Sequence, residues 1–481
     1  STYTDVNMEN GVNSDLNLSY FRDFEDEGHE LSVDLIYADH FDNRQIYRED
    51  ESETSNKTDK VDDEIEYVFA VDYVKPLSQG AKVEAGMKVT SQEYFQNWKA
   101  DEYPYQLDYD ESTIAFYSTY SKELSDKFGI QGGLRFEKVD IQMTLEKTSD
   151  DVDAYPVPGD NILYYLRSEA LNNGPYTPPN YTKLFPSLHL MYKLNEQNSL
   201  KFGYSYRTER PWMRGLNPVP KDELNDNFIR IGNPNLKPEY THAIELDHTL
   251  QKGRNSLSSS IFYNYSTDLI HWWDSDYIYY DSTTTTWSYD EPDSYSIKKD
   301  LMQADNYGSS QRIGFDITAT YFPLPFWFTM ISTSAWKSKL GGDSNESDLQ
   351  GNTVGLYTFF MNRLFLPFGQ LELTGNMFGP MKTTDGFIKP ILGMNMAIQS
   401  SFKNVDITFK VKNVLDNAGF EIDKEDVNTD FIEYLHAYHY REPRTVLLSF
   451  KYAFGKVEES KRKQRKGQGR GRGGGEEGIS Y

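Results

Sequence analysis

Residues 200–207 have the sequence LKFGYSYR, in which apolar and polar side chains alternate. The even positions hold a leucine and three aromatic residues, and the odd positions hold Lys, Gly, Ser and Arg. Because successive side chains of a strand point to opposite faces of a sheet, the alternation predicts a β-strand with one apolar and one polar face. The same period recurs at 65–73, 81–89, 312–321 and 405–412. Repetition at this frequency predicts an all-β protein.

The length of the predicted strands separates two kinds of all-β protein. In a soluble sandwich the charged face is the outside, the apolar face is the core, and strands have about 5–6 residues. Several alternating runs here are about two to three times as long, as at 240–251 and 351–366. Their ends are rich in aromatic residues, which is typical of the girdles at membrane interfaces. These features favour a transmembrane antiparallel up-and-down β-barrel whose apolar face contacts lipid.

Turn-forming residues divide most of the chain into seventeen predicted strands. We expect them at 12–22, 29–39, 63–75, 79–91, 111–124, 127–146, 183–194, 198–209, 240–251, 255–271, 307–322, 325–338, 351–366, 368–378, 388–402, 404–414 and 443–454. Short and long connections alternate between them, as periplasmic turns and extracellular loops do in outer-membrane barrels. Bacterial single-chain barrels have an even number of strands. Since seventeen is odd, we expect further strands to precede residue 1 in the complete barrel.

The composition excludes several classes of protein. The 481 residues include no cysteine, which excludes a disulfide-stapled module. The net charge of −25 argues against a nucleic-acid-binding protein, because neutralising phosphates requires a basic surface. Aromatic residues make up 15% of the chain, which argues against disorder for most of it. The barrel is therefore expected over 1–455, and the basic, glycine-rich stretch 456–481 is predicted to be a disordered tail.

One stretch has the length of a membrane-spanning helix. The uncharged residues ITATYFPLPFWFTMISTSAW lie between Asp316 and Lys337. Pro323 and Pro325, near the middle, would each remove a helical hydrogen-bond donor and clash with the preceding turn. The stretch therefore predicts two strands joined near the prolines.

A series of short motifs occurs between 184 and 239: FPS, a strand, LNE, a strand, then R-x-x-RP, LNP and GNP-x-L-x-PE. They fall on Phe185–Ser187, Leu194–Glu196, Arg207, Arg210–Pro211, Leu216–Pro218 and Gly232–Glu239. This series resembles the carboxy-terminal barrel of TonB-dependent outer-membrane receptors, in particular the outer-membrane β-barrel family common in Bacteroidota. The final predicted strand, which ends in an aromatic residue, is also similar to the family's.

The resemblance implies a fold and a function. Such receptors are similar to 22-stranded barrels that hold a plug domain, so this chain would supply about seventeen of the strands. They import a ligand that extracellular loops have captured, and the TonB-ExbB-ExbD complex energises the plug. Neither a plug nor a TonB box is visible in 1–481. The alternative is therefore a non-transporting barrel that serves as a scaffold or subunit of a larger surface or secretion assembly.

A cellular location and a set of partners follow from the same resemblance. It implies the outer membrane of a Gram-negative bacterium, with the long loops extracellular and the C-terminal tail periplasmic. The implied partners are outer-membrane lipid, the TonB-ExbB-ExbD complex through the unseen plug region, and a surface lipoprotein or other outer-membrane subunits. Nucleic acid is not among them.

Aromatic residues near the predicted loop 272–306 are candidates for ligand contact, because rings bury a large area at little entropic cost. The candidates are Tyr279, Tyr280, Trp287 and, next to the RP motif, Trp212. They would suit sugar rings or an aromatic ligand. For the first three, packing between loops is an equal alternative, whereas Trp272 and Trp273 fit an interfacial girdle.

His436 and His439 lie near two glutamates in the last long loop and are further ligand-binding candidates. Their spacing is not that of a helical HExxH site, so we predict no metal site. No nucleophile elbow or P-loop is present, so we expect neither an enzyme nor a bound cofactor.

The remaining motif residues are predicted to shape loops rather than contact a ligand, because Asn-Pro and Gly-Asn pairs favour tight turns. These residues are Arg210, Pro211, Asn217, Pro218, Gly232, Asn233, Pro234, Pro238 and Glu239.

Overall fold

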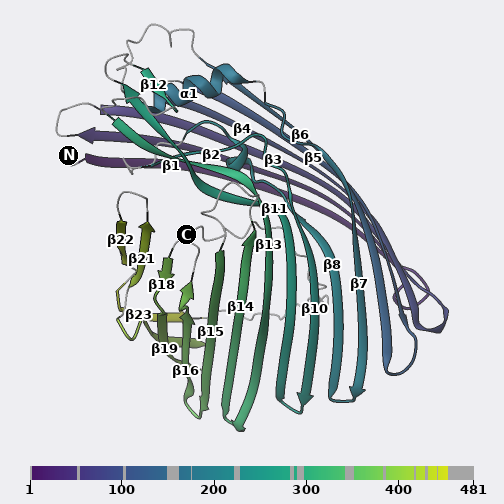
Figure 1. Ribbon diagram of the computed structural model, residues 1–481. Helices are drawn as coiled ribbons and strands as arrows, with labels where there is room; N and C mark the ends of the chain where they lie inside the picture. Colours follow the sequence, from purple (N-terminus) through teal and green to yellow (C-terminus); the bar gives the residue numbers. More distant parts are fainter. Residues whose placement is uncertain are drawn as a thin grey trace.

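A computed structural model shows one curved, almost entirely antiparallel β-sheet (Figure 1). The structure describes residues 3–50, 55–100, 104–148, 162–174, 176–220, 228–281, 286–289, 297–341, 351–382, 386–402, 404–416, 419–427, 432–440 and 443–452. Short turns join the strands at one end of the sheet, and the long connections lie at the other end.

Seventeen long strands of the described residues form the wall of the sheet, each paired with its neighbours in the chain. They are β1 (Tyr3–Asp23), β2 (Glu30–Asp50), β3 (Ser55–Pro76), β4 (Ala81–Ala100), β5 (Tyr105–Glu123), β6 (Phe128–Lys147), β7 (Tyr181–Asn195), β8 (Asn198–Glu209), β10 (Glu239–Lys252), β11 (Asn255–Asp281), β13 (Ile297–Leu324), β14 (Trp327–Gly341), β15 (Gly351–Leu366), β16 (Gly369–Phe378), β19 (Ile391–Phe402), β20 (Val405–Lys412) and β23 (Thr445–Tyr452). Within the described residues β1 pairs only with β2, and β23 pairs only with β20. Each of these two strands therefore has one unpaired edge.

Shorter elements occupy the connections. They are the 3-10 turn η1 (Ser78–Gly80), the helices α1 (Ile162–Asn173) and α2 (Met213–Leu216), and the strands β9 (Phe228–Ile231), β12 (Thr286–Ser288), β17 (Met381–Lys382), β18 (Gly386–Ile388), β21 (Gly419–Val427) and β22 (Ile432–Tyr440). Strand β9 pairs parallel with β13, whereas every other strand pairing among the residues that the structure describes is antiparallel. The predicted all-β class is confirmed, and α1 is the main helical addition to it.

All seventeen predicted strands are present, and 198–209 and 351–366 have their predicted bounds. The turn at 325–326 also confirms that the uncharged stretch forms two strands. The predicted extent of the loop 272–306 is wrong, because β11 continues to Asp281 and β13 already begins at Ile297. Backbone pairing continues there after the apolar alternation that marks a strand in the sequence has ended.

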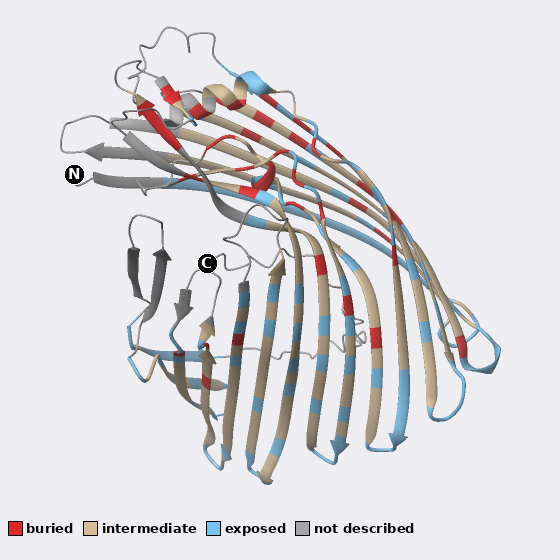
Figure 2. Ribbon diagram, viewed as in Figure 1, coloured by how far each residue is buried: buried red, intermediate tan, exposed pale blue. Residues whose placement is uncertain are grey.

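The two faces of the sheet differ as predicted. Large apolar side chains recur on the outer face nearer the short turns, and many are exposed. Figure 2 shows exposed residues recurring along these strands between less exposed ones. Examples are Leu16, Leu18, Leu35, Phe116, Leu134, Ile261, Ile313, Phe315, Ile331 and Phe409. The inner face carries polar contacts between strands, such as the hydrogen bond from the Thr119 hydroxyl to the Glu84 carboxylate at 3.0 Å. This division is typical of a barrel whose outer surface contacts lipid.

Along β5 and β6 the apolar side chains change from the outer face to the inner face. Nearer the short turns the outer side chains are apolar, as at Phe116 and Phe136, which lie opposite each other. Beyond the level at which Ile114 faces Lys138, the outer side chains are polar: Gln106, Asp108, Asp110, Ser112, Asp140, Gln142 and Thr144. Beyond the same level most inner side chains are buried and apolar, and Glu111 and Thr113 are the polar ones among them. The apolar ones are Tyr105, Leu107, Tyr109, Val139, Ile141, Met143 and Leu145. The exchange marks where the apolar outer zone of these two strands ends.

Candidate ligand-binding surface at the long-connection end

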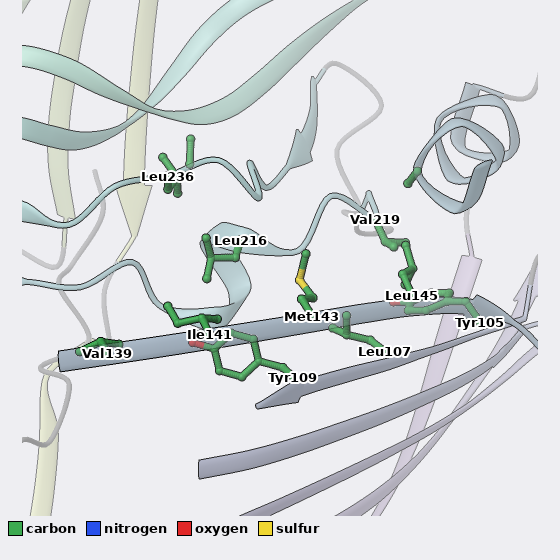
Figure 3. Close-up of a cluster of buried hydrophobic side chains, with 12 residues drawn as sticks. Tyr105, Leu107, Tyr109, Val139, Ile141, Met143, Leu145, Leu216, Val219 and Leu236 are labelled. Carbon is green, nitrogen blue, oxygen red and sulfur yellow. The ribbon is translucent and has the colours of Figure 1, made fainter. Parts of the chain in front are cut away.

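The connection from β8 to β10 folds against the inner face of the sheet. We call its described residues, 210–220 and 228–238, the inner segment. Leu216, Val219 and Leu236 of this segment pack with the buried apolar side chains of β5 and β6 (Figure 3). None of the three is more than 4% exposed. Burying each of these side chains contributes about 1.5–3 kcal/mol. Together they anchor the inner segment to the inner face of β5 and β6.

Arg210 links the inner segment to three strands. Its guanidinium donates hydrogen bonds to the Tyr181 hydroxyl of β7 at 2.7 Å, to Glu111 of β5 at 3.0 Å and to Glu137 of β6 at 2.9 Å. The side chains of the two glutamates are only 13% and 7% exposed. Burial alone would lower the pKa of Arg210, but the phenol and the two carboxylates outweigh burial and raise it above its ordinary value. Arg210 is therefore a permanent positive charge between two buried negative ones.

The two Asn-Pro turns of the inner segment lie against each other. The Gly232 N–H donates to the Asn217 carbonyl at 2.9 Å, and the Asn233 N–H donates to the Gly215 carbonyl at 2.7 Å. The side-chain oxygen of each asparagine also accepts the backbone N–H two residues later, at 2.9 Å in both turns. A Cβ atom at Gly232 would lie 2.3 Å from the Asn217 carbonyl oxygen, so this approach requires glycine.

Asn306 of β13 holds the far end of the inner segment. Its side-chain amide donates to the carbonyls of Lys237 at 2.9 Å and Asp268 at 2.8 Å, and its oxygen accepts the Lys237 N–H at 2.6 Å. Pro238 is buried directly after this contact, and β10 begins at Glu239. On these contacts we propose a structural role for the motif residues from Arg210 to Glu239.

The candidate aromatic residues of β11 and β12 are buried. Tyr279, Tyr280 and Trp287 are 5%, 8% and 6% exposed, and the rings of the last two lie 5.2 Å apart. Tyr280 and Trp287 pack with Leu166 of α1 and Ile229 of β9 in a second apolar cluster. The extended strands thus carry these rings into a core between connections, and their contact with a ligand stays a prediction. Of the two alternatives, the structure favours packing.

The other sequence candidates lie elsewhere in the chain. Trp212 lies within the inner segment and is 41% exposed, and its indole lies over Gly215. His436 and His439 belong to β22, and Trp272 and Trp273 belong to β11; the side chains of these four residues lie outside the described part of the structure. Their ligand contacts and girdle positions stay predictions.

A cleft of about 240 Å³ opens between α1 and the Asn-Pro turns. One face of the helix borders it, with Leu166, Glu169, Ala170 and Asn173 at helical spacing. The other lining residues are Tyr176, Pro218, Ile231, Gly232, Asn233, Pro234, Asn235, Tyr289 and Gln303. Sequence reasoning missed this cleft because α1 is a single short helix inside a long predicted loop. The one feature of the sequence that could have indicated it is the helical spacing of the four α1 residues that line the cleft.

The described residues contain no helix that is long and apolar enough to cross a membrane. In the same part of the chain no three His, Asp or Glu side chains are grouped so that they could hold a metal ion. The candidate features at this end of the sheet are the cleft and the inner segment.

Several solved receptors have a similar fold. The ferric yersiniabactin uptake receptor FyuA from Yersinia pestis is 15% identical with a TM-score of 0.59, over 93% of this chain and 62% of that one. The siderophore receptor PiuA from Acinetobacter baumannii is 12% identical with a TM-score of 0.60, over 93% and 65%. The Serratia marcescens hemophore receptor HasR is 11% identical with a TM-score of 0.58, over 93% and 66%. The chain thus spans about three fifths of the first receptor, and identities this low show the fold alone.

No curated protein matches the chain by sequence. The model of the outer membrane protein β-barrel family matches residues 22–452, from the end of β1 to the end of β23. The chain is therefore located in the outer membrane of a Gram-negative bacterium. The family match indicates this location, and the antiparallel wall with its apolar outer face agrees with it. The chain belongs to the outer membrane protein β-barrel family.

Proposed function

We propose that this chain is the barrel part of a TonB-dependent outer-membrane receptor that imports a ligand captured at the long-connection end. A plug domain would fill the lumen, and the TonB-ExbB-ExbD complex would energise it. The barrel itself would bind and conduct the ligand and catalyse no reaction.

The unpaired edges of β1 and β23 carry this proposal. In lipid, each unsatisfied backbone N–H or C=O group costs several kcal/mol, so a wall with open edges requires additional strands. The chain matches solved receptors over 93% of its own length but covers only 62–66% of theirs. The remaining length of such a receptor suffices for further strands and a plug.

The arrangement of the wall supports an orientation. The short turns would face the periplasm and the long connections the exterior, as in other outer-membrane barrels. The polar outer surface of β5 and β6 beyond Ile114 and Lys138 would then project above the bilayer. Since β23 runs toward the short-turn end, the tail 456–481 that follows the barrel domain 1–455 would lie in the periplasm.

The same open edges support a second candidate function. Strands of another outer-membrane subunit would complete the wall, and a surface lipoprotein or a secretion component would cover the long-connection end. The chain would then be a scaffold that transports nothing.

Binding of TonB separates the two functions. The full-length protein, in lipid nanodiscs, is titrated with the purified periplasmic domain of TonB, and its ion conductance is measured in planar bilayers. A receptor would bind this domain saturably and conduct poorly, because a plug closes the lumen. As a control, the Arg207→Met variant changes an exposed side chain of the wall, and it should bind the TonB domain as the unmodified protein does.

Absence of TonB binding, together with stable co-purification of another outer-membrane subunit, would replace the receptor with the scaffold. A large, steady conductance would contradict the plugged receptor.

A further inference from the structure

Two neighbouring strands of the wall, β7 and β8, separate toward the long-connection end. Their backbone ladder ends at the pair of Ser187 and Ser205. Beyond that pair, residues 181–186 of β7 remain paired with β6, and residues 206–209 of β8 remain paired with β10. Within these described residues no backbone pair joins the two stretches to each other. We call the two stretches together the seam.

The sequence explains where the ladder ends. Pro186, in the FPS motif, is the first residue of β7 beyond the last pair with β8. In sheets proline is confined to edges and bulges, because it has no backbone N–H to donate to a ladder. On the other strand, β8 ends at Glu209, and Arg210 turns inward to contact β5 and β6. The two strands therefore diverge at the motif residues that border them.

Side chains close the seam in place of a backbone ladder. The rings of Phe185 and Tyr206 lie 5.6 Å apart, and Tyr206 stacks on Tyr240 at 5.9 Å. Tyr181 meets Tyr240 edge to face at 6.4 Å, and the Lys183 ammonium lies 4.3 Å from the centre of the Tyr240 ring. Phe185 is only 7% exposed. Aromatic packing thus links β7 to β8 and β10 along the seam.

Arg210 bridges the seam at its far end. It directly follows Glu209, the last residue of β8, and donates a hydrogen bond at 2.7 Å to Tyr181, the first residue of β7. Its ion pairs with Glu111 and Glu137 extend the link to β5 and β6. While these contacts hold, the end of β8 and the inner segment stay attached to β7.

The outer side of the seam lies beside apolar surface. Leu184 of β7 is 52% exposed and lies opposite Phe136, which in turn lies opposite Phe116 in the apolar zone of the outer face. A separation of β7 from β8 at this level would therefore open toward lipid. Because backbone groups without partners are costly in lipid, the closed arrangement is favoured while its side-chain contacts are intact.

The seam differs from the rest of the wall in what must break for two strands to part. Strands β5 and β6, for comparison, are paired from Tyr105 to Glu123 without interruption. Separating them would break a long series of backbone hydrogen bonds. Across the seam, ring contacts and the hydrogen bonds of Arg210 are the contacts between described residues that must break.

We propose that the seam is a lateral gate in the wall and that Arg210 holds it closed. When the contacts of Arg210 break, β7 and β8 separate beyond Ser187 and Ser205, and the inner face is joined to the apolar outer zone. The proposal does not depend on the proposed function, because it requires only the wall and the inner segment.

Distances between spin labels, measured by pulsed electron paramagnetic resonance on the full-length protein in nanodiscs, test this gate. The 481 residues contain no cysteine, so within them only introduced cysteines are labelled. Thr182→Cys with Glu209→Cys places two labels on exposed positions across the seam. Met191→Cys with Lys201→Cys is the matched control, because these exposed residues are register partners on the same two strands. Without further changes, we expect one dominant short distance for each pair.

Arg210→Met should increase the population of a second, longer distance in the seam pair at least threefold and leave the control pair unchanged. Tyr181→Phe removes only the hydrogen bond between Arg210 and β7, keeps both ion pairs, and should cause a smaller increase. Arg44→Met changes an exposed side chain of β2 far along the sheet and should cause none.

The gate is overturned if neither Arg210→Met nor Tyr181→Phe lengthens the distance across the seam. It is also overturned if the control pair lengthens equally, because the wall would then loosen as a whole, or if Arg44→Met has the same effect. If Arg210→Met does not assemble, the result with Tyr181→Phe decides, since that variant leaves both glutamates paired.

Discussion

The guanidinium of Arg210 lies 2.9 Å from the carboxylate of Glu137, although 73 residues separate them in the sequence. This contact joins the connection after β8 to the inner face of β6. Because Glu111 and Tyr181 bind the same guanidinium, four side chains from four parts of the chain satisfy one another. The inner segment is therefore a fixed part of the wall.

Replacing Arg210 with Met should destabilise the barrel by about 3 kcal/mol, because two largely buried carboxylates would lose their shared cation. The midpoint of urea unfolding, read from heat-modifiable migration on gels, measures the change. Arg207→Met is the control, since Arg207 is 62% exposed and 4.0 Å from Glu245. Such a pair contributes about 0–1 kcal/mol. Equal effects of the two variants would contradict the role of Arg210.

Gly232→Ala should separate the two Asn-Pro turns, because the added Cβ would meet two backbone oxygens at 2.3 and 2.7 Å. A cost of about 1–3 kcal/mol is expected from overpacking. Gly132→Ala in β6 is the control, since nothing lies within 4 Å of the Cβ position there. Protease cleavage within the inner segment should increase for the first variant only, and cleavage that increases for neither would show that the turns tolerate a side chain.

Phe116→Arg should impair assembly by about 2–4 kcal/mol if the outer face of β5 contacts lipid at this level. Asp110→Arg places the same charge on the same face of the same strand, beyond the level at which the faces exchange character. It should fold normally. The fraction of heat-modifiable protein in outer membranes is the measurement, and similar fractions for both variants would place the lipid boundary elsewhere.

Trp287→Ala should loosen the second apolar cluster, because a buried ring that packs against Tyr280 would be lost. Removing a buried Trp side chain costs about 3–5 kcal/mol, here confined to the connections. Trp287→Phe retains a ring and should cost much less. Hydrogen exchange of β12 and α1 reports the difference, and unchanged exchange in the alanine variant would argue that this ring is available to a ligand.

The sequence predicted the wall because alternation and turn residues report directly on strands. It predicted them best where one face is strongly apolar, as at 198–209. It missed the first part of β1, where only Val6 and Met8 alternate with polar residues after Tyr3. There the backbone pairing with β2 determines the structure, and single-strand periodicity carries no information about pairing partners.

The candidate site was less accessible to sequence reasoning. The motif around Arg210 was recognised, but nothing in the spacing identifies Glu111 and Glu137 as its partners. The rings of Tyr279 and Trp287 suggested a binding surface, and long-range packing with Leu166 of α1 buried that region instead. The cleft itself depends on α1 lying beside two turns more than forty residues later, and only the tertiary structure shows such a contact.

The open edges of the wall are tested most directly by a cryo-electron microscopy structure of the full-length protein in a lipid bilayer. The predicted result is that the free edges of β1 and β23 are hydrogen-bonded to about five further strands, which complete a barrel around a globular plug. Direct hydrogen bonding between β1 and β23, with no strand between them, would contradict it.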